Sequence, residues 1–330
     1  MNSEPSPAPR ARRHRSTVLT AALTLPLLTV AACGSNAAQG GSAGTDRPTA
    51  PSTGTGTSGG TSGTPAPSGT SQPGTTTPQP STGTTGGTGG TTAKAIGTSV
   101  YFLHGEKVSP APRTVTAPAT ATGAVRALLA GPSRYERGQG RTTAIPSGTQ
   151  LRSVVVRDHV ATVDLSGRYD DGGGSLSMRA RLAQVVFTLT RFSSVQKVAF
   201  ELDGKPVKHF GGEGVVLNGP IGRADFEDLS PAVLVESPLI GGSVNTPVRV
   251  WGSANTFEAE FRLKVTDAAG RVAADVQVMA TSGTGTRGTF DVTFPYKAAR
   301  TGPGLLTAYF LSPANGRPVT VDTVPLTVNR

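Results

Sequence analysis

The sequence predicts an α+β domain, with two helices on a mixed or antiparallel sheet, followed by an all-β sandwich. Between residues 94 and 229, strand-like runs are interspersed with two amphipathic helical segments. Between residues 230 and 330, about seven short strand-like runs follow one another without a helix. Residues 33–93 are so rich in Gly, Thr, Ser and Pro that they predict a disordered linker ahead of both domains.

Residues 1–32 have the layout of a signal peptide. A basic start is followed by a nearly uninterrupted apolar run at 18–32. This run is shorter than the roughly 20 residues that a membrane-spanning helix needs. The small residues Ala31 and Ala32 come directly before Cys33, the only cysteine of the chain. The pattern predicts export and general secretion.

The string Val30-Ala31-Ala32-Cys33 resembles the lipobox of bacterial lipoproteins. The resemblance implies cleavage between Ala32 and Cys33, a lipid on the Cys33 thiol, and anchoring to the extracellular face of the cell membrane. A lone thiol in an oxidising compartment has no disulfide partner within the chain, which favours a modification that consumes it. The alternative is an ordinary secretory signal with an incidental cysteine.

The net charge of +10 is spread over the chain. The signal segment carries +3, the linker 0, residues 94–230 carry +5 and residues 231–330 carry +2. Export and the lack of a dense Lys/Arg run argue against nucleic acid as a partner. This modest basicity outside the cell favours anionic envelope polymers or lipid head groups.

Hydrophobic periodicity and turn residues locate the elements of the first domain. The expected elements are a strand at 99–103, a helix at 121–130, paired strands at 151–156 and 160–165, a helix at 176–192, and paired strands at 195–202 and 205–210. Gly131-Pro132 ends the first helix, and Ser175 is the expected N-cap of the second. Asp203-Gly204 is a strong hairpin turn signal.

A long polar stretch at 133–148 separates the first helix from the first strand pair. It reads as a loop, and loops of this length in compact domains are often functional. Three of its charged residues, Glu136, Arg137 and Arg141, are therefore candidates for partner contact. The alternative is a solvated loop with no specific role.

Residues 257–265 alternate apolar and charged side chains, which predicts a strand with one buried face. Further strands are expected at 233–235, 247–251, 272–278, 290–294, 305–311 and 319–328, and within 272–278 every second residue from Val272 is expected to face inward. No cysteine is present here, so an immunoglobulin-like fold would lack its inter-sheet disulfide. The core is expected to centre on Trp251, Phe261 and Phe290.

Five strings of the first domain occur in order. They are Ala-Leu-Leu-Ala-Gly-Pro at 127–132, Ala-Ile-Pro-Ser-Gly-Thr at 144–149, Ala-Thr-Val-Asp-Leu-Ser at 161–166, Gln-Val-Val-Phe-Thr-Leu-Thr at 184–190 and Val-Ala-Phe-Glu-Leu-Asp-Gly at 198–204. Together they resemble the GerM-type domain of sporulation and spore-germination proteins. That family offers no catalytic residues to carry over. Its fold is similar to ring-building domains of envelope-spanning assemblies, which implies protein–protein assembly and leaves oligomer formation open.

The second domain contains Val-Arg-Val-Trp-Gly at 248–252, Ala-Asn-Thr-Phe-Glu-Ala at 254–259 and Pro-Leu-Thr-Val at 325–328. These strings resemble the immunoglobulin-like module that accompanies spore-germination proteins, which implies binding or spacing. The overall composition resembles actinobacterial proteins, many of which form no endospores. Germination itself is therefore not carried over.

Residues suited to catalysis are sparse. Outside the signal, His104, His159 and His209 are scattered without metal-ligand spacing, and no zinc-protease motif occurs. The GxGxxG string at 283–288 lies between two expected strands, where no helix follows to bind a dinucleotide. The sequence therefore predicts no cofactor, no metal and no enzymatic activity.

The function predicted is that of a non-catalytic, lipid-anchored surface protein in envelope assembly or binding. Envelope proteins and anionic wall polymers are the expected partners. Two alternatives stay open: a wall or glycan-remodelling enzyme with an unrecognised site, and a protein that captures a small extracellular ligand at the junction of its two domains.

Overall fold

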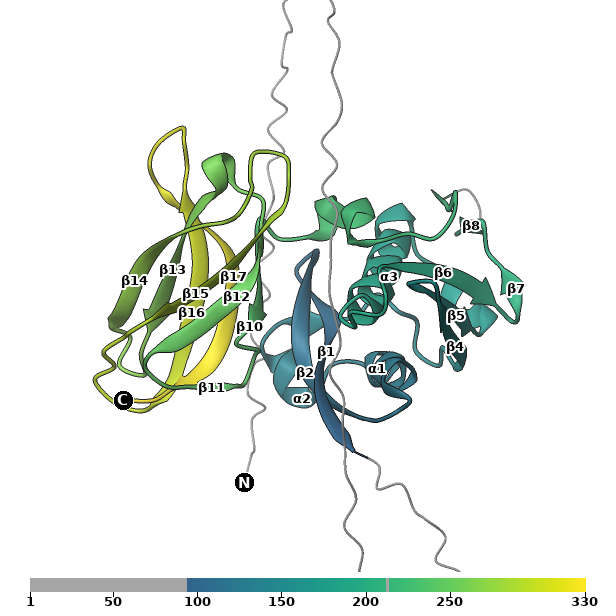
Figure 1. The fold of residues 1–330 in the computed structure, drawn as a ribbon, viewed down its shortest axis with the longest axis horizontal. Helices are drawn as coiled ribbons and strands as arrows, with labels where there is room; N and C mark the ends of the chain where they lie inside the picture. The colour runs from purple at the N-terminus through teal and green to yellow at the C-terminus, as the bar shows by residue number, and fades with distance from the viewer. Residues whose placement is uncertain (1–93, 212–213) are drawn as a thin grey trace, which may run out of the picture. The chain divides into compact units, whose positions relative to one another are not determined.

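A computed structural model describes residues 94–211 and 214–330 (Figure 1). The predicted signal segment, Cys33 and the linker lie outside these residues. Among the helices of the described residues, none has the length and apolar character needed to cross a membrane. We refer to residues 94–222 as the α+β half and to residues 230–330 as the β half; both lie within one compact unit.

The α+β half contains two main sheets where a single sheet was expected. The first has the antiparallel order β2-β1-β3, from β1 (Ala95–His104), β2 (Lys107–Thr116) and β3 (Arg141–Thr142). The second has the order β4-β5-β6-β7, from β4 (Leu151–Arg157), β5 (Val160–Leu165), β6 (Lys197–Leu202) and β7 (Lys205–Pro206). Its central pair, β5 and β6, is parallel, and its other pairs are antiparallel. A short hairpin of β8 (His209–Phe210) and β9 (Val215–Val216) follows.

Three α-helices accompany these sheets: α1 (Thr120–Leu129), α2 (Arg134–Gly138) and α3 (Ser175–Leu189). Helix α3 is buried along almost its whole length, and Figure 1 shows it beside β6. It begins one residue before the sequence prediction. Its N-cap is Gly174, with no side-chain cap, so the expected capping role of Ser175 was wrong.

Two buried polar side chains of α3 complete the hydrogen bonding of β1. Gln184 donates to the Tyr101 carbonyl at 3.1 Å, and Thr188 Oγ1 accepts from the Tyr101 N–H at 3.0 Å. Strand β3 pairs with β1 only at Leu103 and His104, so β1 lacks a strand neighbour on that side at Tyr101. Since buried backbone groups require partners, these two side chains attach the helix to the sheet.

Both predicted hairpin turns are present. Asp158 and His159 have φ values of 49° and 61°, and Asp203 and Gly204 have 50° and 75°. Left-handed conformations at both central residues are what a two-residue hairpin of type I′ requires.

The β half is an immunoglobulin-like sandwich. One sheet has the order β10-β12-β15, from β10 (Val233–Ser237), β12 (Val248–Ala254) and β15 (Gly288–Phe294). The other has the order β11-β17-β16-β13-β14, from β11 (Ser243–Val244), β13 (Glu260–Thr266), β14 (Val272–Met279), β16 (Gly302–Leu311) and β17 (Pro318–Val328). The rings of Phe261 and Phe290 pack against each other in the core, with their centroids 4.8 Å apart, and link the two sheets.

Three residues of the β half do not lie where the sequence placed them. Phe257 is 58% exposed because residues Phe257–Ala259 form a 3-10 turn instead of the start of the strand. Glu258 and Ala259 have positive φ there, which breaks the alternation. Val272 is exposed at the end of β14, and Trp251 lies on the outer face of β12 instead of in the core.

Candidate functional site

The junction between the halves is built around Arg223, the first residue of a 3-10 segment at Arg223–Leu229. Its Nε donates to Thr190 Oγ1 at 2.8 Å, and its Nη2 donates to the Tyr101 hydroxyl at 3.2 Å. Its Nη1 forms an ion pair with the buried Glu236 of β10. One guanidinium therefore contacts β1, the end of α3 and the β half.

The electrostatics of this cluster keep Arg223 charged and Tyr101 neutral. Burial works to lower the pKa of Arg223, but the neighbouring Tyr101 and Glu236 outweigh it and raise that pKa above its usual value. Burial raises the pKa of Tyr101 well above the ordinary phenol range, against the opposing charge of Arg223. A hydroxyl that stays neutral beside a guanidinium that stays charged makes this a structural cluster and a poor proton-transfer site.

The far end of the same 3-10 segment is held by a second ion pair. Arg287 of the β half donates from Nε and Nη2 to the two carboxylate oxygens of Glu227, both at 2.9 Å. Asn255 adds a hydrogen bond of 2.8 Å to Glu227. Arg179 of α3 binds Asp228 at 2.5 Å. The 3-10 segment is thus attached to both halves.

Arg141, a predicted partner contact, is buried inside the junction. Its Nη2 donates to the Thr323 carbonyl of β17 at 3.0 Å, and its Nε donates to Ser109 Oγ at 3.2 Å. The carboxylate of Asp322, beside Thr323, is also buried. Burial raises the pKa of Asp322 to about 6, although a hydrogen bond from the Val235 N–H and the charge of Arg141 both act to lower it.

Glu136 is also buried, and it pairs with Arg113 at 2.6 Å. It closes a capping box with Ser133 at the start of α2. Burial works to raise the pKa of Glu136, but hydrogen bonds from Arg113 and from the Ser133 N–H hold it below its usual value. The spacing Ser-x-x-Glu at 133–136 was a readable signal for this helix start.

The sequence prediction of an open loop at 133–148 was therefore wrong. The stretch contains α2 and β3, and the internal partners of Glu136 and Arg141 leave these two side chains little surface for an outside protein. Arg137 is the exposed member of the three, although its guanidinium donates to the Pro132 carbonyl. Partner contact through Arg137 stays a prediction.

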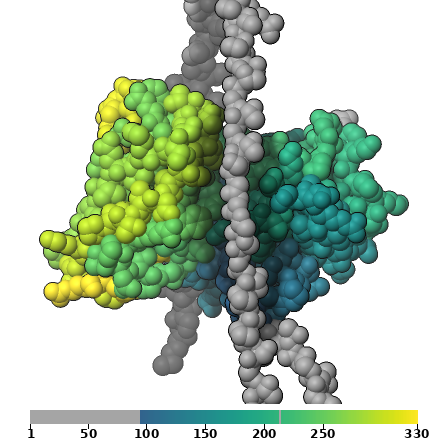
Figure 2. Space-filling model, in the orientation of Figure 1, coloured from purple at the N-terminus to yellow at the C-terminus, as the bar shows by residue number. Residues whose placement is uncertain are grey.

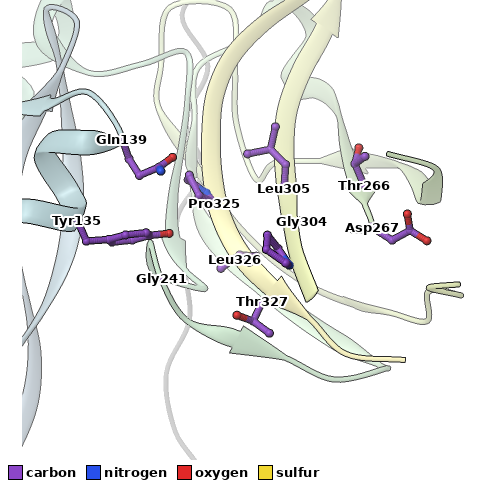
Figure 3. A pocket seen from close by; sticks show the side chains of 11 residues that line it. Tyr135, Gln139, Gly241, Thr266, Asp267, Gly304, Leu305, Pro325, Leu326 and Thr327 are labelled. Carbon is purple, nitrogen blue, oxygen red and sulfur yellow. The ribbon is translucent and has the colours of Figure 1, made fainter. Parts of the chain in front are cut away.

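A groove of about 760 Å³ lies between α2 and the edge of the β half. Tyr135 and Gln139 reach from α2 toward the strand that carries Pro325 (Figure 3). A Cβ at Gly241 would lie 3.1 Å from the Tyr135 ring, so the glycine permits this close approach. Leu326 contributes a further apolar surface. Apolar walls with a few polar groups suit binding.

Two titratable side chains line this groove. They are Tyr135 and Asp267. Asp267 accepts hydrogen bonds from the backbone N–H groups of Ala299, Arg271 and Ala269, and these bonds lower its pKa. A carboxylate held ionised in this way stabilises a turn and is not tuned as a general acid.

The three histidines of the described residues occupy separate elements. His104 ends β1, His159 sits in the β4–β5 turn, and His209 lies in β8. Burial and the charge of Arg141 lower the pKa of His104. Across residues 94–211 and 214–330, no group of three or more His, Cys, Asp or Glu side chains could hold a metal ion.

The fold and junction define a class of protein: an α+β domain joined by a packed 3-10 segment to an immunoglobulin-like sandwich. Comparison with protein families agrees with this class. Residues 99–208 match the Germane family, described as "Sporulation and spore germination". Residues 232–317 match Gmad2, described as "Immunoglobulin-like domain of bacterial spore germination". Residues 99–208 are therefore similar to a GerM-type domain and residues 232–317 to a Gmad2 domain, and these are not known enzyme families.

Three solved structures are similar to this chain. The first GerMN domain of the sporulation protein GerM from Bacillus subtilis is 21% identical, with a TM-score of 0.32, over 39% of this chain and 99% of that one. A proposed lipoprotein from Clostridium perfringens is 22% identical, with a TM-score of 0.31, over 41% and 93%. The tandem GerMN domains of Bacillus subtilis GerM are 15% identical, with a TM-score of 0.34, over 61% and 62%. Comparison with curated proteins gave no significant match.

Proposed function

We propose that this chain is a non-catalytic, lipid-anchored protein of the extracellular membrane face that acts in envelope assembly or binding. The observation that carries the proposal is the order of segments in one chain. A signal-like segment and a lipobox-like string precede a linker, a GerM-type domain and a Gmad2 domain. Domains of sporulation and germination families support a surface or binding role.

The linker sets how far the binding domains reach. For about 60 residues of flexible chain, a mean span of roughly 40–45 Å follows from 5–6 Å times the square root of length. The two domains would therefore act near the membrane, within the wall zone. Envelope proteins or anionic wall polymers are the proposed partners, in keeping with the modest positive charge of residues 94–330.

Crosslinking in the native cell tests this role. The full chain and a control ending at residue 93 both carry a C-terminal affinity tag, so that both keep the proposed anchor. We expect envelope proteins or wall polymer to be enriched only by the full chain. Equal recovery from both proteins at several growth stages would remove the proposed role of residues 94–330.

The groove beside Tyr135 favours a second candidate function, capture of a small extracellular ligand at the junction. Its volume of about 760 Å³ lies in the range of ligand sites, and residues from both halves line it. A metabolite that binds there should raise the melting temperature of the protein in a saturable manner. Replacing Tyr135 with alanine should abolish that shift, whereas an unchanged shift would place the ligand elsewhere.

A further inference from the structure

The outer face of the three-stranded sheet β10-β12-β15 carries a second groove, of about 750 Å³. Trp251, the only tryptophan of the chain, lies in its wall. Residues 248, 250, 252 and 254 of β12 are buried, so Arg249, Trp251 and Ser253 project from the opposite face. Figure 2 shows the β half as the green to yellow part of the surface.

Polar side chains flank Trp251 on the neighbouring strand. Asp291 lies directly opposite Trp251 in the β12–β15 register, and Thr289 lies opposite Ser253. Arg249 donates from Nε to Asp291 Oδ1 at 2.8 Å and from Nη2 to the other carboxylate oxygen. Two of the five guanidinium N–H donors are used in this pair, so donors remain for a ligand.

The orientation of the indole ring is fixed from one side. The Arg191 guanidinium lies over the ring, 4.9 Å from its centroid. Arg191 lines a neighbouring groove of about 520 Å³, and this neighbour shares Trp251 and Glu236 with the 750 Å³ groove. Trp251 lines both grooves, whereas Arg191 lines only the 520 Å³ groove. The indole therefore stands between them, with Arg191 on the side of the smaller groove. A positioned aromatic surface loses little entropy when a ligand packs on it.

The charges of the groove identify the class of ligand. Its four charged lining residues form two ion pairs, Arg249 with Asp291 and Arg223 with Glu236. The lining is therefore neutral, and the Asp291 and Glu236 carboxylates would oppose a polyanion. A sugar ring offers a C–H face to an aromatic platform and hydroxyl or amide groups to Arg, Asp, Ser and Thr side chains.

We propose that the Trp251 groove binds an uncharged, linear glycan strand, with the indole as platform and the Arg249–Asp291 pair as the hydrogen-bonding clamp. This inference goes beyond the proposed function, because it adds an uncharged glycan to the envelope proteins and anionic wall polymers named there. A protein partner on this face is an outcome of the test below and would overturn the inference.

The single tryptophan provides the measurement. Purified full-length protein is titrated with the hexamer of N-acetylglucosamine while its tryptophan emission is followed. We expect a saturable change in emission, and calorimetry should show a loss of affinity of about tenfold or more for Asp291→Asn and for Arg249→Gln. Trp251→Ala should show no binding in the calorimeter. The matched control is Arg152→Gln, which breaks a similarly exposed ion pair in the α+β half and should bind within twofold of wild type.

Pelleting with insoluble cell wall separates the failure of this inference from the failure of the proposed function. Retention of wild type with loss of Asp291→Asn supports the groove. Equal retention of both proteins overturns the proposal that the Trp251 groove binds the glycan, and it leaves a wall-binding role intact. Recovery of a protein crosslinked to this face overturns the same proposal and also leaves the proposed function intact. No saturable emission change at millimolar hexamer also overturns the groove, and the cell crosslinking experiment then decides the proposed function by itself.

Discussion

Replacing Arg223 with methionine is expected to destabilise the protein by about 3 kcal/mol. The change leaves Glu236, 7% exposed, as a buried carboxylate without its ion-pair partner. It also removes the donor to the Tyr101 hydroxyl. Truncating one member of a buried charge pair costs more than the pair contributes, because the remaining charge is still desolvated. Urea denaturation of the full-length protein measures the loss.

Two further variants show that the effect comes from the orphaned charge. Arg152→Met removes a surface ion pair with Asp203, whose side chains are about half exposed, and should cost about 0–1 kcal/mol. The double variant Arg223→Met with Glu236→Gln should recover much of the lost stability, because neither charge remains buried. A double variant no more stable than Arg223→Met would contradict this account of the junction.

Replacing Asp322 with asparagine is expected to change how stability depends on pH. The pKa of Asp322 is raised from its ordinary value to about 6 in the folded protein, and in the unfolded chain it is about 3.9. Between about pH 4 and pH 6 the unfolded chain therefore releases a proton that the folded protein keeps. Wild type should lose up to about 3 kcal/mol relative to Asp322→Asn as pH rises through this window.

Urea denaturation at a series of pH values measures that difference, with Asp291→Asn as the control. The Arg249 side chain holds the pKa of Asp291 below its usual value through a hydrogen bond. Asp291 therefore stabilises the fold above its unfolded pKa of about 3.9 and loses this contribution only as pH falls below about 4, so wild type and Asp291→Asn should run parallel between about pH 4 and pH 6. Parallel stability curves for wild type and Asp322→Asn would contradict this account, because they would show that the pKa of Asp322 is not raised in the folded protein.

Local patterns in the sequence were sufficient for much of the fold. Asp203-Gly204 sets a turn by its own conformational preference, and the central strands and the sandwich follow from hydrophobic alternation. Phe257 shows where such patterns fail. The alternation of Phe257, Ala259 and Phe261 indicates a strand, but the consecutive residues Glu258 and Ala259 are left-handed and turn the chain. The conformational preferences of Glu and Ala do not predict a left-handed backbone at these two positions.

The candidate sites depended on contacts that no local pattern contains. Arg223 meets Tyr101, a residue 122 positions away, and Arg141 meets Thr323, 182 positions away. Arg141 and Glu136 were expected on a surface loop because charged residues are usually exposed. Trp251 was expected inside because apolar aromatics usually are, but the neighbours at 250 and 252 take the buried face of β12. The groove around Trp251 thus arises from which face packs inward.

The central claim is that the chain acts outside the membrane, held there by a lipid on Cys33. The mass of the N-terminal peptide, measured on protein purified from the native cell, tests this claim most directly. We predict a peptide that begins at Cys33 and carries the mass of a diacylglycerol group, and that is missing from a Cys33→Ser variant. An unmodified Cys33, or an N-terminus at another residue, would contradict the claim.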